Sequence, residues 1–142
     1  MRETASVFII HNLAQAEAAV SAGRIANKSV TLWSAPGAAY YVGVGWWQGL
    51  RTLLDRSLPR ERKKDTYTMV LDCGSAAGFA MAAIRMGVSG ICFLGTEDVT
   101  RKLADMASVR GIDFLTVRQT ASDLAEVKNP QSFCLHYLQD AA

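Results

Sequence analysis

The sequence lacks a surplus of charge of either sign, and it lacks any long apolar run. Fifteen basic and thirteen acidic side chains leave a formal net charge of +2 over 142 residues. This balance gives no electrostatic reason to expect nucleic acid or an anionic membrane as a partner. No apolar stretch reaches the roughly 18 residues of a membrane span, and the first residues lack the long apolar region of a secretory signal.

Cysteine is also scarce, and its number is odd. Cys73, Cys92 and Cys134 are widely spaced, which fits neither a disulfide framework nor the ligand spacing of a zinc site. We therefore expect reduced thiols in a cytoplasmic protein without a metal site. The glycine-rich segment 43–49 falls inside a predicted helix rather than in a strand-to-helix turn, so it is not read as a dinucleotide site, and the cofactor stays unknown.

The composition is that of one globular domain, with half of the residues hydrophobic and a fifth charged. A cluster of basic residues surrounds Pro59, but Glu61 and Asp65 dilute it and no aromatic residue interrupts it. Such a charge pattern favours a solvated loop over a nucleic-acid contact.

The hydrophobic period alternates along the chain between short apolar runs and helical spacing. The runs predict five strands, at 7–10, 30–33, 67–71, 90–94 and 112–117. Helical spacing predicts helices over 13–23, 36–58, 76–86 and 97–110. Asn12 and Thr96 are expected as N-caps, with Gln15 in capping-box position, and Gly87 as a helix stop.

This order of elements predicts an α/β protein with a three-layer, doubly wound, parallel five-stranded sheet. The flavodoxin-like strand order 2-1-3-4-5 is the most economical choice. A (β/α)8 barrel has the same local pattern but needs roughly 250 residues, so this chain could supply only half of one.

The last part of the chain differs from the rest. Residues 1–118 form the predicted α/β sandwich domain, and 119–142 form a C-terminal tail. The tail is polar up to Pro130 and apolar again over 133–138. We expect it to dock on the domain or on a partner subunit, because an apolar segment of that length is unfavourable in water.

Ligands of open parallel sheets bind at the carboxyl ends of the strands, where the strand order reverses. With the order 2-1-3-4-5 that point lies between the first and third strands. We predict a pocket there, lined by His11, Asn12, Asp72 and Gly74. The candidate ligand-binding residues are Asn12, Ser34, Gly37, Gly74, Ser75, Gly95 and Thr96.

Three side chains at this edge are candidates for catalysis: His11, Asp72 and Cys73. Cys73 precedes a predicted helix N-terminus, whose dipole lowers the pKa of a thiol, and His11 could pair with it. In the alternative, structural interpretation, Asp72 and Ser75 cap the helix and Gly74 makes the turn.

Four aromatic residues lie close together in the predicted helix 36–58. Tyr40, Tyr41, Trp46 and Trp47 cannot all face the sheet, since adjacent residues of a helix diverge by about 100°. Tyr40 and Trp47 are expected to point outward and to form the contact of a homodimer.

The segment Val70-Leu71-Asp72-Cys73-Gly74, followed by Gly78, Ala80, Ala83 and Gly87, resembles small single-domain bacterial α/β proteins. The resemblance covers the third helix and its two strands, and it implies a fold without an activity. The same residues are also similar to βα units of aldolase-type barrels, although no lysine ends a predicted strand here to form a Schiff base.

Three functions remain open. The first is a module that binds or senses a small polar ligand at the strand ends, and the second is an enzyme that uses His11, Asp72 and Cys73. The third is an interaction protein that works through the aromatic helix and the tail. An enzyme needs a histidine and an acid in hydrogen-bond reach, whereas an interaction protein needs a flat aromatic face.

Overall fold

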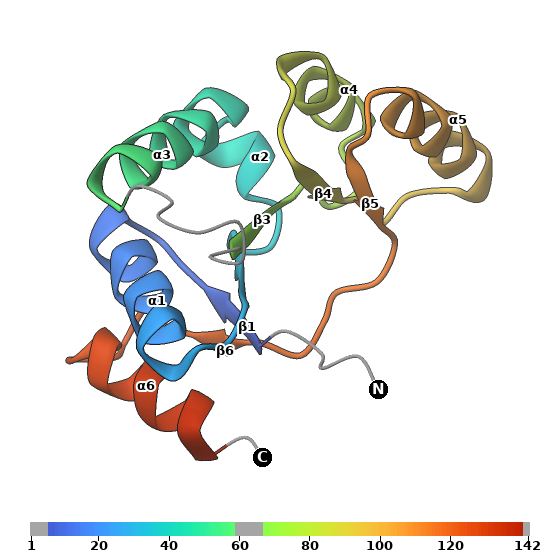
Figure 1. The fold of residues 1–142 in the computed structure, drawn as a ribbon. Helices are drawn as coiled ribbons and strands as arrows, with labels where there is room; N and C mark the ends of the chain where they lie inside the picture. Colours follow the sequence, from blue (N-terminus) through green and yellow to red (C-terminus); the bar gives the residue numbers. More distant parts are fainter. Residues whose placement is uncertain (1–5, 59–66, 141–142) are drawn as a thin grey trace. The chain divides into compact units, whose positions relative to one another are not determined.

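The structure is a computed structural model that describes residues 6–58 and 67–140. The charged loop expected around residues 60–66 lies outside the described residues. Helices and strands alternate, and the pairings β1–β6, β3–β4 and β4–β5 are parallel, which confirms the α/β class (Figure 1). The elements are β1 (Ser6–Ile9), α1 (Leu13–Ala26), β2 (Val30–Trp33), α2 (Ala38–Tyr41), α3 (Val44–Ser57), β3 (Tyr67–Asp72), α4 (Ala77–Met86), β4 (Gly90–Cys92), α5 (Glu97–Val109), β5 (Asp113–Leu115), β6 (Ser122–Asp123) and α6 (Pro130–Asp140).

The number and order of the strands differ from the prediction. The described residues form six strands in the order β5-β4-β3-β2-β1-β6, so the five-stranded, flavodoxin-like order 2-1-3-4-5 is wrong. Strands β1 to β5 are consecutive neighbours, so this part of the sheet is wound in one direction. The order 2-1-3-4-5 would instead place the second strand on one side of the first and the third to fifth strands on the other. As a result β2 separates β1 from β3, and the predicted switch point between them does not exist.

The chain divides into two compact units. The first comprises the described residues of 1–32, 50–68 and 120–142, and the second comprises 33–49 and 69–119. The residues of the predicted tail from 120 onward therefore belong to the same unit as the described residues of 1–32 and 50–68. Among the described residues no helix combines the length and the apolar character that crossing a membrane requires.

In the first unit, β1 pairs with β6, and α6 packs on α1 (Figure 1). Cys134 and Leu138 of α6 are buried, and the Lys28 ammonium group donates to the Leu138 carbonyl at 2.6 Å. The Tyr137 ring meets Phe8 edge-on, with 5.5 Å between the ring centroids. The tail thus docks on its own chain, because an amphipathic helix buries its apolar side against α1.

The start of α1 agrees with the sequence analysis. The Asn12 side chain accepts a hydrogen bond from the Gln15 backbone N–H at 2.9 Å, so Asn12 is the N-cap. The Gln15 side-chain oxygen accepts from the His11 N–H at 2.7 Å, one residue earlier than in a standard capping box. Its amide nitrogen donates to the Leu124 carbonyl at 3.0 Å, which ties α1 to the end of β6.

In the second unit, β3, β4 and β5 are neighbours, and α4 packs beside α5 (Figure 1). Small residues of α4, Ala80 and Ala83, are fully buried and allow close approach of the helix. Gly87 ends α4 with φ +76°, as expected of a left-handed cap. Thr96 is the N-cap residue of α5, but its side chain makes no capping hydrogen bond.

The predicted single helix over 36–58 is broken into α2 and α3 at Gly43, whose φ is +100°. The break resets the phase of the helix, so Val44, Trp47, Leu50 and Leu54 become its buried positions. Trp47 is only 1% exposed, and the predicted homodimer contact through Trp47 is therefore wrong. Tyr40 is exposed, as expected. The homodimer itself stays a prediction.

Candidate functional site

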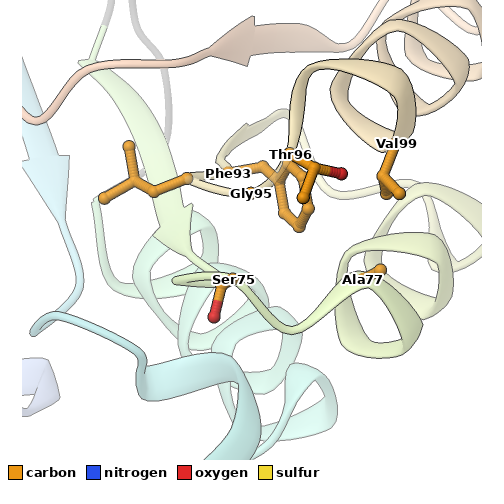
Figure 2. A pocket seen from close by; sticks show the side chains of 7 residues that line it. Ser75, Ala77, Phe93, Gly95, Thr96 and Val99 are labelled. Atoms are coloured by element: carbon orange, nitrogen blue, oxygen red, sulfur yellow. The ribbon is translucent and has the colours of Figure 1, made fainter.

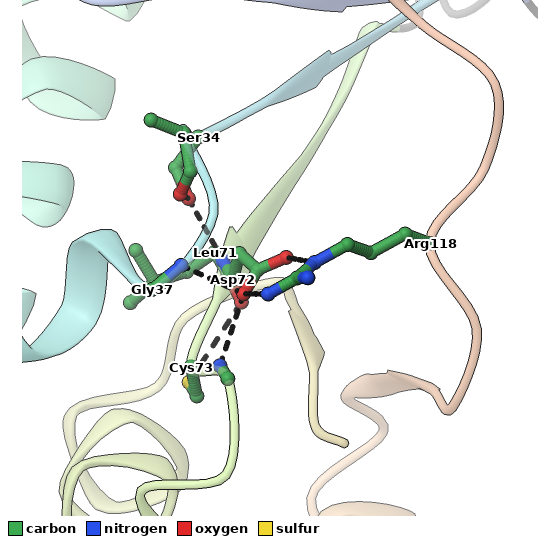
Figure 3. Close-up of polar contacts among 8 residues, drawn as sticks. Ser34, Gly37, Leu71, Asp72, Cys73 and Arg118 are labelled. Carbon is green, nitrogen blue, oxygen red and sulfur yellow. Dashed lines mark hydrogen bonds and ion pairs between the residues drawn. The ribbon is translucent and has the colours of Figure 1, made fainter.

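The most tightly organised polar group of the second unit surrounds Asp72 at the end of β3. Its side chain is 1% exposed, and both oxygens accept hydrogen bonds (Figure 3). Oδ1 accepts from the backbone N–H groups of Gly37 and Gly74, each at 2.9 Å. The Asp72 N–H donates to the Ser34 hydroxyl at 2.8 Å. Buried carboxylates are found where donors replace water in this way.

A guanidinium group completes the arrangement. Arg118 donates from Nε to Asp72 Oδ2 at 2.7 Å and from Nη2 to Oδ1 at 3.1 Å, a bidentate pair (Figure 3). The Arg118 side chain is 44% exposed, so the pair joins a buried acid to a base that reaches solvent.

These contacts set the protonation states of both groups. Burial by itself would raise the pKa of Asp72, but the hydrogen bonds from Arg118, Gly37 and Gly74 outweigh it and hold that pKa below its ordinary value. The hydrogen bond to Asp72 in turn raises the pKa of Arg118. The pair is therefore ionised at neutral pH.

Two positive-φ glycines shape the turns that donate to Asp72. Gly37 has φ +71° and Gly74 has φ +55°, conformations that L side chains rarely adopt. The ring of Tyr40 lies against both turns: a Cβ built on Gly37 would collide with the Tyr40 Oη, and one on Gly74 would lie 3.1 Å from its Cε1. Glycine is favoured at both positions because of the positive φ, and at Gly37 a side chain would also collide with this ring.

A pocket of about 430 Å³ lies beside the network, along the loops that follow β3 and β4 (Figure 2). The Gly74 carbonyl accepts from the Leu94 N–H at 2.7 Å, so the loop that Asp72 anchors is joined to the other wall of the pocket. The fully buried Phe93 ring packs against Gly95. The lining residues are Ser75, Ala77, Phe93, Leu94, Gly95, Thr96 and Val99.

The expected nucleophile is not activated. Cys73 is fully buried and its thiol lies 3.7 Å from the Leu71 carbonyl. Burial, together with the charge of Asp72, raises the pKa of Cys73 to about 12, so the expectation that the helix dipole lowers it is wrong. A neutral, inaccessible thiol is a poor nucleophile at physiological pH.

His11 has a different partner from the expected ones. In the first unit its Nε2 lies 2.6 Å from Asp123 Oδ1, at the adjacent ends of β1 and β6. Burial raises the pKa of Asp123, but the Ala125 N–H and His11 outweigh it and lower that pKa. Asp123 is therefore a carboxylate, and it accepts a hydrogen bond from His11 when Nε2 carries a proton.

The predicted site residues thus fall into separate groups. Ser34, Gly37, Asp72 and Gly74 form one network, and Ser75, Gly95 and Thr96 line the pocket beside it. His11 and Asn12 belong to the first unit. The pocket expected between the first and third strands loses its basis, since those strands are not neighbours.

Sequence reasoning missed Arg118 and the pairing of Asp123 with His11. Arg118 directly follows the predicted strand 112–117, and this position was the available signal, because it places the side chain at the same carboxyl edge as Asp72. Among the described residues, no three side chains of His, Cys, Asp or Glu gather in a way that could hold a metal ion.

Comparison with known proteins adds the fold alone. No protein-family model and no curated protein matches the sequence. A solved structure from Coccidioides immitis, described as a "putative fructose-1,6-biphosphate aldolase", matches with a TM-score of 0.61 and 16% sequence identity. The match covers 78% of this chain and 44% of that chain, so the present chain spans less than half of its length. The chain is therefore similar in fold to part of an aldolase-like α/β structure.

Proposed function

We propose that the second unit binds a small polar molecule in the pocket at the carboxyl ends of β3 and β4. The supporting observation is the ion pair between buried Asp72 and half-exposed Arg118, which lies beside an open pocket. The Asp72 carboxylate accepts from two backbone N–H groups and one guanidinium group, and it thereby fixes the turns at Gly37 and Gly74. A fixed wall lowers the entropic cost of binding a ligand.

The lining supports a polar ligand of modest size. The volume of about 430 Å³ lies within the range of small-molecule sites. Ser75 and Thr96 contribute hydroxyl groups, while Leu94 and Val99 supply an apolar surface. Mostly apolar walls with a few placed polar groups are typical of sites for metabolites.

The test is a screen of small polar metabolites against the ¹⁵N-labelled full chain. We expect a bound compound to shift the backbone resonances of Ser75, Gly95 and Thr96. Ser75→Leu should abolish these shifts by filling the pocket, whereas Ser108→Leu, an exposed position on α5, should not. The proposal fails if no compound shifts the pocket resonances, or if Ser75→Leu binds as well as the wild type.

A second candidate function, general-base catalysis, is favoured by the His11–Asp123 contact of 2.6 Å. A carboxylate that accepts from Nε2 fixes the tautomer and leaves Nδ1 able to take a proton from a substrate or water. Asp123 is itself held by the Ala125 N–H at 2.9 Å, and the Gln15 side chain accepts from the His11 backbone N–H, so both partners of the contact are anchored.

Hydrolysis of activated esters by the full chain tests this candidate. We expect His11→Gln to abolish the activity and Asp123→Asn to lower it. His136→Gln is the matched control, because His136 pairs with Asp140 at 2.9 Å but is 80% exposed. An activity that survives His11→Gln, or that His136→Gln removes equally, would rule out the dyad as its source.

A further inference from the structure

Arg118 has more donors than Asp72 uses. A guanidinium group carries five N–H donors, and the contacts with Asp72 occupy one on Nε and one on Nη2. The second N–H of Nη2 and one N–H of Nη1 form the free end of the planar group, which is called its outer edge below. Within residues 6–58 and 67–140 no hydrogen bond is made by Nη1, and the side chain is 44% exposed.

Asp72, in contrast, has no capacity left for a ligand. Its Oδ1 accepts three hydrogen bonds and its Oδ2 accepts the short one from Nε. The acid is also buried, so a ligand cannot reach it. Asp72 is therefore a positioning residue that orients Arg118, and a ligand would contact only the outer edge of the guanidinium group.

Exposed aromatic rings lie beside this charged pair. Tyr40, Tyr41 and Phe79 are 51%, 60% and 43% exposed, and the Tyr40 ring lies 5.8 Å from that of Tyr41 and 6.4 Å from that of Phe79. Tyr40 covers Gly37 and Gly74, the two residues whose N–H groups hold Asp72. Large rings that cluster in the open usually mark a binding surface.

We propose that the outer edge of Arg118 binds an oxyanion, a carboxylate or a phosphate, of a ligand whose flat ring lies on Tyr40. This inference goes beyond the proposed function, because neither Arg118 nor Tyr40 lines the pocket of that proposal. A guanidinium edge matches the two oxygens of such a group, and lysine would not reproduce that geometry. The aromatic surface adds offset or edge-to-face contacts with a planar ring.

The experiment compares three probes by titration into the ¹⁵N-labelled full chain. Benzoate carries both features, benzamide has the ring without the charge, and acetate has the charge without the ring. We expect benzoate to shift the resonances of Gly37, Gly74 and the Arg118 Nε–H, with affinity at least fivefold greater than that of either other probe.

Variants separate the two contacts. Arg118→Lys keeps a charge near Asp72 and should weaken benzoate at least fivefold, whereas Arg101→Lys, which alters an exposed pair with Asp98 on α5, should not. Tyr40→Leu should weaken benzoate without changing acetate, and Tyr40→Phe should leave benzoate unchanged. Tyr137 is an exposed tyrosine of α6, and Tyr137→Leu is the control that should leave benzoate binding unchanged.

Each result supports or overturns the inference. Equal binding of benzamide and benzoate at Gly74, or no loss with Arg118→Lys, would overturn the oxyanion contact. Unchanged benzoate binding by Tyr40→Leu would overturn the ring contact. In either case the binding function would still stand if metabolites shift Ser75, Gly95 and Thr96, and it would fall only if none does.

Discussion

Replacing Arg118 by methionine tests the ion pair at the centre of the second unit. Methionine keeps most of the apolar stem but removes the two donors to Asp72 at 2.7 and 3.1 Å. Hydrogen bonds to charged groups contribute about 1.5–3 kcal/mol each. Water can replace part of this interaction, because the guanidinium group is 44% exposed. We therefore expect a loss of about 2 kcal/mol in the free energy of unfolding at neutral pH. Removing one partner of a wholly buried pair would instead cost roughly 3–5 kcal/mol.

The loss should depend on pH in a defined direction. In the wild type the pKa of Asp72 is lowered, so its ionised form contributes stability above the pKa of the unfolded chain, and this contribution disappears as the pH falls through the folded-state pKa. Without Arg118, burial raises the pKa of Asp72 relative to the wild type. The difference between the two proteins should therefore be largest at neutral pH and should shrink in acid, where the carboxyl group is neutral in both.

Urea unfolding followed by circular dichroism measures this difference. With a slope of roughly 2 kcal/mol per molar urea, the midpoint should move by about 1 M. Arg101→Met is the matched control: its pair with Asp98 is exposed on both sides, and exposed pairs contribute about 0–1 kcal/mol. The reasoning is refuted if Arg118→Met is as stable as Arg101→Met, or if its deficit is the same at about pH 7 and at about pH 2, below the lowered pKa of Asp72.

The remaining predictions concern the core and the docked helix. Trp47→Ala should destabilise the protein by about 3–5 kcal/mol, because Trp47 is 1% exposed. Tyr41 is exposed, so Tyr41→Ala should change stability by less than about 0.5 kcal/mol, and equal effects of the two substitutions in thermal unfolding would contradict the burial of Trp47. Leu138→Ala should cost about 2–5 kcal/mol and Gln139→Ala almost nothing, and an unaffected melting curve for Leu138→Ala would mean that α6 does not stabilise the unit. All three cysteines should stay unmodified by a thiol reagent at neutral pH, since burial raises their pKa values to about 11 or 12; rapid labelling of the native protein, read by mass spectrometry, would contradict this.

The sequence by itself determined the class of the fold and most of its elements. Alternation between short apolar runs and helical spacing is a local property, and it located β1 to β5, α1, α4 and α5. Local chemistry also determined the cap at Asn12 and the helix stop at Gly87, because both depend on residues within one turn. The polar residues after the strands marked the carboxyl edge, at which Ser34, Gly37, Asp72 and Gly74 lie together.

Only the tertiary structure decided which strands are neighbours and which side chains pair. The local pattern of a parallel sheet is the same for the order 2-1-3-4-5 and for consecutive neighbours, so periodicity cannot choose between them. One glycine with φ +100° changed the phase of α3 and turned Trp47 inward, which a single helical period could not anticipate. Arg118 meets Asp72 across 46 residues of sequence, and His11 meets Asp123 across 112. Such contacts follow from strand order and burial rather than from spacing along the chain, and for that reason they became visible only in the folded molecule.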